Sequence, residues 1–142
     1  MTPSLEKAKM TLLEGGFTFV LVNGDQEYVS SLMGIAPLLS LLKNSPGLLK
    51  GASVADKVVG KAAAMLMLYG GVSDIYSGII SHPALSVLEK AELKIESDRR
   101  VSYIENRAGT DMCPMEKRVL HLSDPEECYR LLSDTLEQLD KT

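Results

Sequence analysis

Aromatic residues are scarce in this chain, which has no tryptophan, two phenylalanines and five tyrosines among 142 residues. Proteins that bind single-stranded nucleic acids stack the bases on aromatic side chains, so the scarcity argues against such a platform. The net charge of -4 also argues against binding to a phosphate backbone. We therefore expect no nucleic-acid partner.

Cysteines and long apolar runs are equally sparse. Cys113 and Cys128 are too few and too isolated for the disulfide framework of a small secreted protein, and no signal-peptide pattern begins the sequence. The longest apolar run, Ala62 to Tyr69, falls short of the roughly 20 residues that cross a bilayer. We expect a cytoplasmic protein without membrane contact.

Recognisable metal and phosphate motifs are missing as well. The sequence contains neither a G-x-G-x-x-G loop nor a G-x-x-x-x-G-K-S/T loop. His82 and His121 show no metal-ligand spacing to each other or to Cys113. We expect no metal ion and no cofactor.

The composition that is present indicates one globular domain over residues 1–142. Apolar residues make up 45% and charged residues 24%, which is ordinary for a folded soluble protein. A chain of this length buries about two thirds of its unfolded surface in a single core.

The first third of the chain predicts a helix, a hairpin and a short second helix. Apolar residues recur at helical spacing between Pro3 and Gly15. The β-branched run 17–22, the turn dipeptide Asn23-Gly24 and the run 26–30 predict a β-hairpin. Pro37 then opens a helix that ends near Lys43.

Residues 53–70 predict a buried helix followed by a buried strand. Ser53 and Asp56 form a variant of the capping box, and Gly70-Gly71 ends the helix. Most residues between them are apolar or small, which is typical of a helix that is covered on several sides. The continuous apolar run 72–80 predicts an inner strand.

The chain beyond residue 83 predicts a helix to about Ala91 and then two half-exposed strands, 93–96 and 101–105, on either side of residues 97–100. Pro114 opens a further helix, and Pro125 opens the last one, which runs to about Leu139. This order predicts an α/β fold, a three-layer α/β/α sandwich around a mixed sheet of about five strands.

The leucine-rich segment 34–49 has two interpretations. It covers one face of the core or a subunit interface, as apolar patches often do, or it forms a lid over a site. The subunit alternative motivates an assembly role and leaves a homo-oligomer open.

Lys57 and Lys61 are the candidate cations, because they lie one turn apart in the predicted helix 53–70. They either present ammonium groups to an anionic ligand, with Lys61 as cation or base, or form a narrow stripe that reaches solvent. Lys61 follows Gly60 and precedes three alanines, a composition that allows close backbone approach to a ligand.

Cys113 is the candidate nucleophile. It is predicted to be the N-cap of the helix that Pro114 opens, and the backbone N–H groups and dipole of a helix N-terminus favour a thiolate. Asn106, Asp111 and Glu116 cluster around it as candidate ligand-binding residues. The alternatives are a cysteine that packs as a small apolar residue and a plain polar turn.

The order hairpin, helix, strand, helix, strand, strand resembles the cytidine deaminase-like fold. In that family, zinc is bound by the His (or Cys) of an H-x-E motif at the start of the helix after the hairpin and by the two Cys of a P-C-x-x-C motif at the start of the next helix. The matching places here are Asp56 to Lys61 and Pro83 to Val87. Ala84 and Val87 replace the two thiolates, and alkyl groups cannot bind zinc.

The whole length, including Lys61 and the Cys-Pro-Met-Glu start of a late helix, resembles the uncharacterised prokaryotic family named domain of unknown function eighteen ninety-three. The resemblance implies the deaminase-like fold without its metal, and the family has no settled activity.

The sequence therefore leaves three hypotheses for function. The chain is an enzyme, or a descendant of one, with a pocket for a small nucleotide-like or anionic ligand near Lys61 and Cys113. Alternatively, it is a non-catalytic binding or regulatory module, or an assembly protein.

Overall fold

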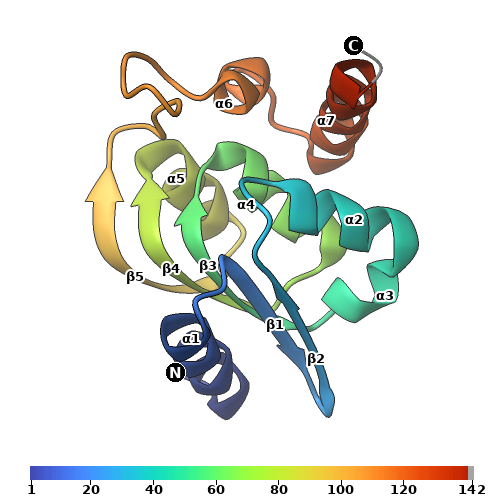
Figure 1. Ribbon diagram of the computed structural model, residues 1–142, viewed down its shortest axis with the longest axis vertical. Helices are drawn as coiled ribbons and strands as arrows, with labels where there is room; N and C mark the ends of the chain where they lie inside the picture. The colour runs from blue at the N-terminus through green and yellow to red at the C-terminus, as the bar shows by residue number, and fades with distance from the viewer. Residues whose placement is uncertain (141–142) are drawn as a thin grey trace.

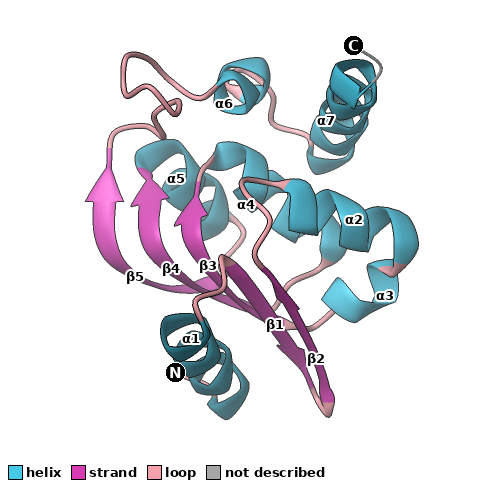
Figure 2. Cartoon of the chain, viewed as in Figure 1, coloured by secondary structure: helices cyan, strands magenta, loops and turns pink. Residues whose placement is uncertain are grey.

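A five-stranded mixed sheet lies between one helix on one face and several helices on the other (Figures 1 and 2). The computed structural model describes the backbone of residues 1–140 and side chains up to residue 135. The elements are α1 (Pro3–Gly15), β1 (Phe19–Asn23), β2 (Gln26–Ser30), α2 (Ala36–Asn44), α3 (Pro46–Leu49), β3 (Ser53–Val59), α4 (Lys61–Gly70), β4 (Asp74–Ser81), α5 (His82–Lys90), β5 (Lys94–Val101), α6 (Pro114–Val119) and α7 (Pro125–Asp140).

The strands are ordered β2-β1-β3-β4-β5. The β1–β2 and β1–β3 pairs are antiparallel, whereas β3–β4 and β4–β5 are parallel. The parallel pairs need crossover connections, which α4 and α5 provide. The predicted α/β sandwich with a mixed five-stranded sheet is therefore confirmed.

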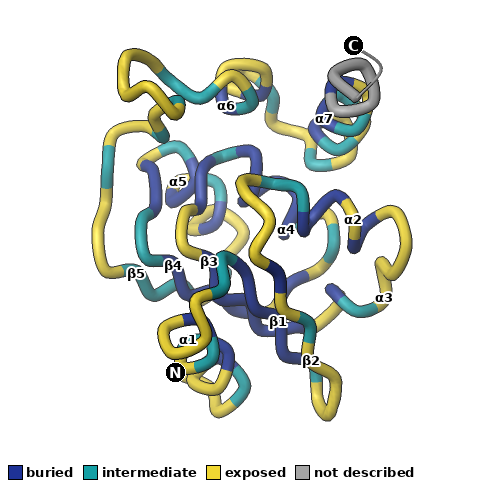
Figure 3. Tube along the Cα trace, in the orientation of Figure 1, coloured by how far each residue is buried: buried dark blue, intermediate teal, exposed yellow. Residues whose placement is uncertain are grey.

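Each face of the sheet has its own apolar core. Leu5, Ala8 and Leu12 of α1 pack with Val20 of β1 and Tyr76 of β4 on one side. The larger core on the opposite face includes Phe19 and Leu21, because successive strand residues point to opposite faces. Figure 3 shows the buried residues along β1, β3 and α4.

The predicted hairpin is confirmed, but its turn lies one residue later. Asn23 pairs with Gln26, so Gly24 and Asp25 form the two-residue loop. Gly24 has a φ of 60° and takes the first central position of the turn, where a type II′ turn needs glycine. The sequence pattern predicts Asn23 at this position and Gly24 at the second.

The predicted helix 53–70 is wrong over its first half. Ser53–Val59 is β3, which pairs with β1 on one side and β4 on the other, and only Lys61–Gly70 is helical. The hydroxyl of Ser53 donates to Asp74 rather than capping a helix. Two flanking strands outweigh the local capping signal, and the β-branched valines suit a pleated sheet.

The two predicted strands 93–96 and 101–105 are also corrected. Lys94–Val101 is one continuous strand, β5, which pairs with β4 throughout, so residues 97–100 do not form a turn. A polar run is tolerated here because β5 is an edge strand whose outer side faces solvent.

The leucine-rich segment 34–49 forms α2 and α3 and turns its leucines inward. Leu38, Leu39, Leu41, Leu42 and Leu49 are all buried in the larger core. The segment therefore covers the core, and the exposed leucine surface that motivated an assembly role is absent from these helices.

Candidate functional site

A mostly apolar cavity of about 250 Å³ opens at the carboxyl end of β3. Its wall comes from the residues before β1 and α2, the end of β3, the start of α4, and α6 with the loop before it. Figure 1 shows α6 beyond the carboxyl ends of β3, β4 and β5. Ligands of α/β proteins bind at this edge of the sheet, where neighbouring connections diverge. The polar residues on the wall are Thr18, Asp56, Lys57, Cys113 and Glu116.

Asp56 is the buried acid of this cavity. It is 5% exposed and lies in β3 opposite Phe19 of β1 and Ser77 of β4. Burial raises the pKa of its carboxyl to about 8, and the backbone N–H groups of Val58 and Lys57 offset part of the rise. A buried carboxyl with a strongly raised pKa in an apolar pocket is a hallmark of functional sites. Near neutral pH, Asp56 is therefore mostly protonated.

Glu116 caps the N-terminus of α4 from a distant part of the chain. Its Oε1 accepts from Lys61 N at 2.6 Å and its Oε2 accepts from Ala62 N at 2.8 Å. Burial raises the pKa of Glu116, whereas these two hydrogen bonds and the charge of Lys61 lower it. Gly60 permits the approach, because a Cβ there would lie 2.1 Å from Oε1. The carboxylate thus occupies the helix end that an external anion would use.

Cys113 lines the same cavity as Asp56 and Glu116. It is the N-cap of α6, as predicted, is half-buried, and its side chain makes no capping hydrogen bond. Its backbone N–H donates to Ile104 O at 2.8 Å, which ties Cys113 to the start of the loop that follows β5. The thiol is therefore held at the cavity wall by backbone contacts.

Lys57 and Lys61 do not share a helix face. Lys57 belongs to β3 and lines the cavity, whereas Lys61 is the first residue of α4. Lys61 Nζ donates to Leu120 O at 2.7 Å, at the C-terminal end of α6, and its side chain lines a separate groove between α4 and α5. Lys61 thus reaches the cavity through its backbone bond to Glu116, and its ammonium group lies elsewhere.

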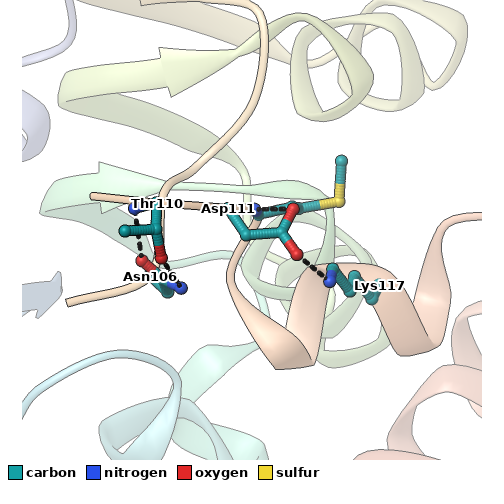
Figure 4. Close-up of polar contacts among 5 residues, drawn as sticks. Asn106, Thr110, Asp111 and Lys117 are labelled. Atoms are coloured by element: carbon teal, nitrogen blue, oxygen red, sulfur yellow. Dashed lines mark hydrogen bonds and ion pairs between the residues drawn. The ribbon is translucent and has the colours of Figure 1, made fainter. Parts of the chain in front are cut away.

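Asn106 and Asp111 lie in an exposed loop that does not line the cavity. Figure 4 shows Asn106 exchanging hydrogen bonds with Thr110, at 3.2 and 3.1 Å, and Asp111 paired with Lys117. The Lys117 contact lowers the pKa of Asp111. These side chains stabilise the loop that leads into Cys113. The structure thus brings together Lys57, Cys113 and Glu116 of the predicted site.

Sequence reasoning missed Asp56 as a site residue, because it was assigned to a helix cap. The available signal was an acidic residue within a run of valines and alanines that ends in Gly60. A charge inside an apolar strand pattern points to a buried functional group.

The described residues carry neither a membrane-spanning helix nor a cluster of metal ligands. No helix within residues 1–140 combines the length and the apolar character that crossing a bilayer requires. Among the described side chains, no group of three His, Cys, Asp or Glu residues is placed to hold a metal ion.

Comparison with known proteins places the chain in a family. A family model described as TM1506, domain of unknown function (DUF1893), matches residues 7–136. The crystal structure of a DUF1893 family protein (TM1506) from Thermotoga maritima is similar, with a TM-score of 0.86 and 29% sequence identity. That match covers 95% of this chain and 92% of the other. A search of curated proteins found no match. The family resemblance is therefore confirmed, and the chain belongs to the DUF1893 family.

Proposed function

We propose that this protein binds a small molecule in the cavity at the end of β3. The observation that carries the proposal is Asp56, a buried carboxyl on the wall of an apolar cavity with no ion-pair partner among the described side chains. An unpaired buried acid destabilises a fold, so its presence calls for a compensating role. The volume of about 250 Å³ lies just below the usual range for small-molecule sites, which suits a compact ligand.

The structure removes the main argument for the anionic ligand that the sequence predicted. That expectation rested on Lys57 and Lys61 acting from one helix face, and these residues lie on different elements. The N-terminus of α4 already binds the carboxylate of Glu116. A neutral or cationic ligand is therefore the better match to the cavity.

The resemblance to cytidine deaminases stays a prediction, but the position of the cavity agrees with it. The helix after the hairpin is α2, and α4 follows the next strand. The matching helix starts are therefore near Ile35 and Gly60, not at Asp56 to Lys61 and Pro83 to Val87 as predicted, because residues 53–59 form β3. Residues at both starts line the cavity. Neither start carries a histidine or cysteine, so zinc chemistry is not part of the proposal.

An enzyme and a non-catalytic binding module both remain consistent with this site. The enzyme hypothesis is favoured by Cys113, a thiol that lines the same cavity as the protonated Asp56. Such a pair can supply a nucleophile and a general acid. Loss of turnover in Cys113→Ser with retained binding would establish catalysis, whereas binding without turnover would indicate a regulatory module. The cytoplasmic location and a homo-oligomeric state stay predictions.

The proposal is tested by protein NMR with a set of small cyclic amides, nucleobases and amines. We expect at least one compound to shift signals of residues on the cavity wall and to slow the reaction of Cys113 with N-ethylmaleimide. Prior alkylation of Cys113 should block that binding. The proposal is lost if no compound protects Cys113, or if alkylated protein binds equally well.

A further inference from the structure

The carboxyl group of Asp56 is poorly satisfied within the protein. Its Oδ1 accepts a long hydrogen bond from Val58 N at 3.4 Å, the backbone N–H of Lys57 also contacts the carboxyl, and no side-chain donor among the described residues bonds to it. The neighbouring positions on β1 and β4 are Phe19 and Ser77, which carry no charge. A carboxylate formed here would therefore lack a counter-charge from the flanking strands.

Other titratable groups facing the cavity do not neutralise Asp56. From α6, Glu116 adds a second acid, already bound to backbone N–H groups of α4, and Cys113 adds a thiol. The start of α4 contributes glycine and alanines. Lys57, next along β3, is exposed and forms no ion pair with Asp56 in the described part of the chain. Asp56 thus has no ion-pair partner among the described side chains.

We propose that the ligand of this cavity carries a compact cationic group, an amidinium, guanidinium or ammonium, that pairs with the carboxylate of Asp56. This inference rests on the small-molecule site proposed above and names its ligand class. An amidinium or guanidinium donates two parallel N–H groups, which match the geometry of one carboxylate. The apolar wall contributed by Ile35, Ile104 and Met115 would contact the body of the ligand.

Pairing requires Asp56 to lose its proton, which gives the inference a thermodynamic signature. Its pKa of about 8 in the free protein means that a bound cation displaces about one proton near neutral pH. The affinity for the cation should therefore rise by up to roughly tenfold per pH unit between about pH 6 and 8, and level off above that range.

The test compares benzamidine, benzylamine and the neutral benzamide by isothermal titration calorimetry. Measurement in two buffers with different ionisation enthalpies gives the number of protons released. We expect benzamidine or benzylamine to bind at least about tenfold more tightly than benzamide and to release about one proton. Asp56→Asn should remove both effects, and Asp25→Asn, the same change in the hairpin turn, should leave them intact.

Each outcome separates the inference from the proposed function. Binding of benzamide as tightly as the cations, or cation binding without proton release, would overturn the cationic ligand and leave a small-molecule site. No binding of these probes, together with no protection of Cys113 by any compound, would overturn both. The pH dependence of the unmodified protein provides a test that does not depend on the folding of a variant.

Discussion

Asp56 makes the stability of the protein depend on pH. In the unfolded chain its carboxyl has the ordinary pKa of 3.8, and in the folded protein burial raises the pKa to about 8. The folded state therefore holds a proton that the unfolded state has lost between these values. Because stability falls wherever the folded state binds more protons, the free energy of unfolding should decrease as pH rises from about 4 to about 8.

Asp56→Asn should flatten this decrease, since an amide stays neutral. We expect the variant to be more stable than the parent protein by several kcal/mol near pH 8 and similar to it near pH 4. Urea denaturation across the pH range measures the difference. The raised pKa of Glu116 acts in the same direction, so some slope should persist. Equal slopes in the two proteins would show that Asp56 is ionised in the folded state.

Position 60 requires glycine because the carboxyl group of Glu116 lies where a Cβ would be. An added Cβ would lie 2.1 Å from Glu116 Oε1 and 2.4 Å from its Cδ. Gly60→Ala should therefore displace the carboxylate from the N-terminus of α4 and lower the free energy of unfolding by about 1–3 kcal/mol, the penalty for leaving buried polar groups unsatisfied.

Gly47→Ala is the matched control for this prediction. A Cβ at Gly47 would meet nothing within 4 Å, and the substitution should change the free energy of unfolding by less than about 0.5 kcal/mol. Chemical denaturation of both variants decides the matter. A similar small effect at the two positions would contradict a structural role for the Glu116 cap.

At the scale of elements, α6 is held against α4 by polar contacts that converge on Lys61. The backbone N–H of Lys61 binds Glu116 near the start of α6, and its ammonium binds Leu120 O at the end. A cation at the C-terminal end of a helix also interacts favourably with the helix dipole. Lys61 is thus placed to fix the orientation of α6, and with it the position of Cys113.

Lys61→Met should loosen α6 without unfolding the protein. We expect hydrogen exchange of the α6 amides to become several-fold faster, with a loss of less than about 1.5 kcal/mol in global stability. Lys90→Met on α5 changes the same side chain beside the same groove and should leave α6 unaffected. Unchanged exchange in α6 combined with lost ligand binding would instead indicate a direct role for Lys61 at the ligand.

The elements that sequence could predict are those with local signals. The hairpin is encoded by a glycine-containing turn that follows a β-branched run, and α5, α6 and α7 are each opened by a proline near the N-terminus. β3 was missed because strand pairing on both sides decided its structure over a short capping pattern. Cys113 and Glu116 could be selected near a helix start, whereas the burial of Asp56 follows only from the assembled sheet.

On the scale of the whole molecule, chemical modification of the two cysteines measures two different things: access to the cavity at Cys113 and opening of the core at Cys128. Cys113 is half-buried at the cavity, and Cys128 is fully buried where α7 meets the larger core. Iodoacetamide should therefore modify Cys113 in the native protein and reach Cys128 only when the core opens.

The rate of Cys128 modification should match the rate expected from the free energy of global unfolding, measured by denaturation under the same conditions. Mass spectrometry of the two cysteine-containing peptides gives both rates. In the Cys113→Ser variant, only the slower modification of Cys128 remains to be measured. Modification of Cys128 much faster than global unfolding permits would show that α7 opens as a separate unit.

The bond between Lys61 and Glu116 joins positions 55 residues apart in the chain. All five strands precede Ile104, Cys113 and Glu116 in the sequence. A chain cut after β5 would therefore hold every strand of the sheet, while the N-terminus of α4 would lack its carboxylate and the cavity would lack one wall. The cavity therefore depends on the segment that follows the sheet, so a chain truncated after Val101 would retain the strands and lose the site.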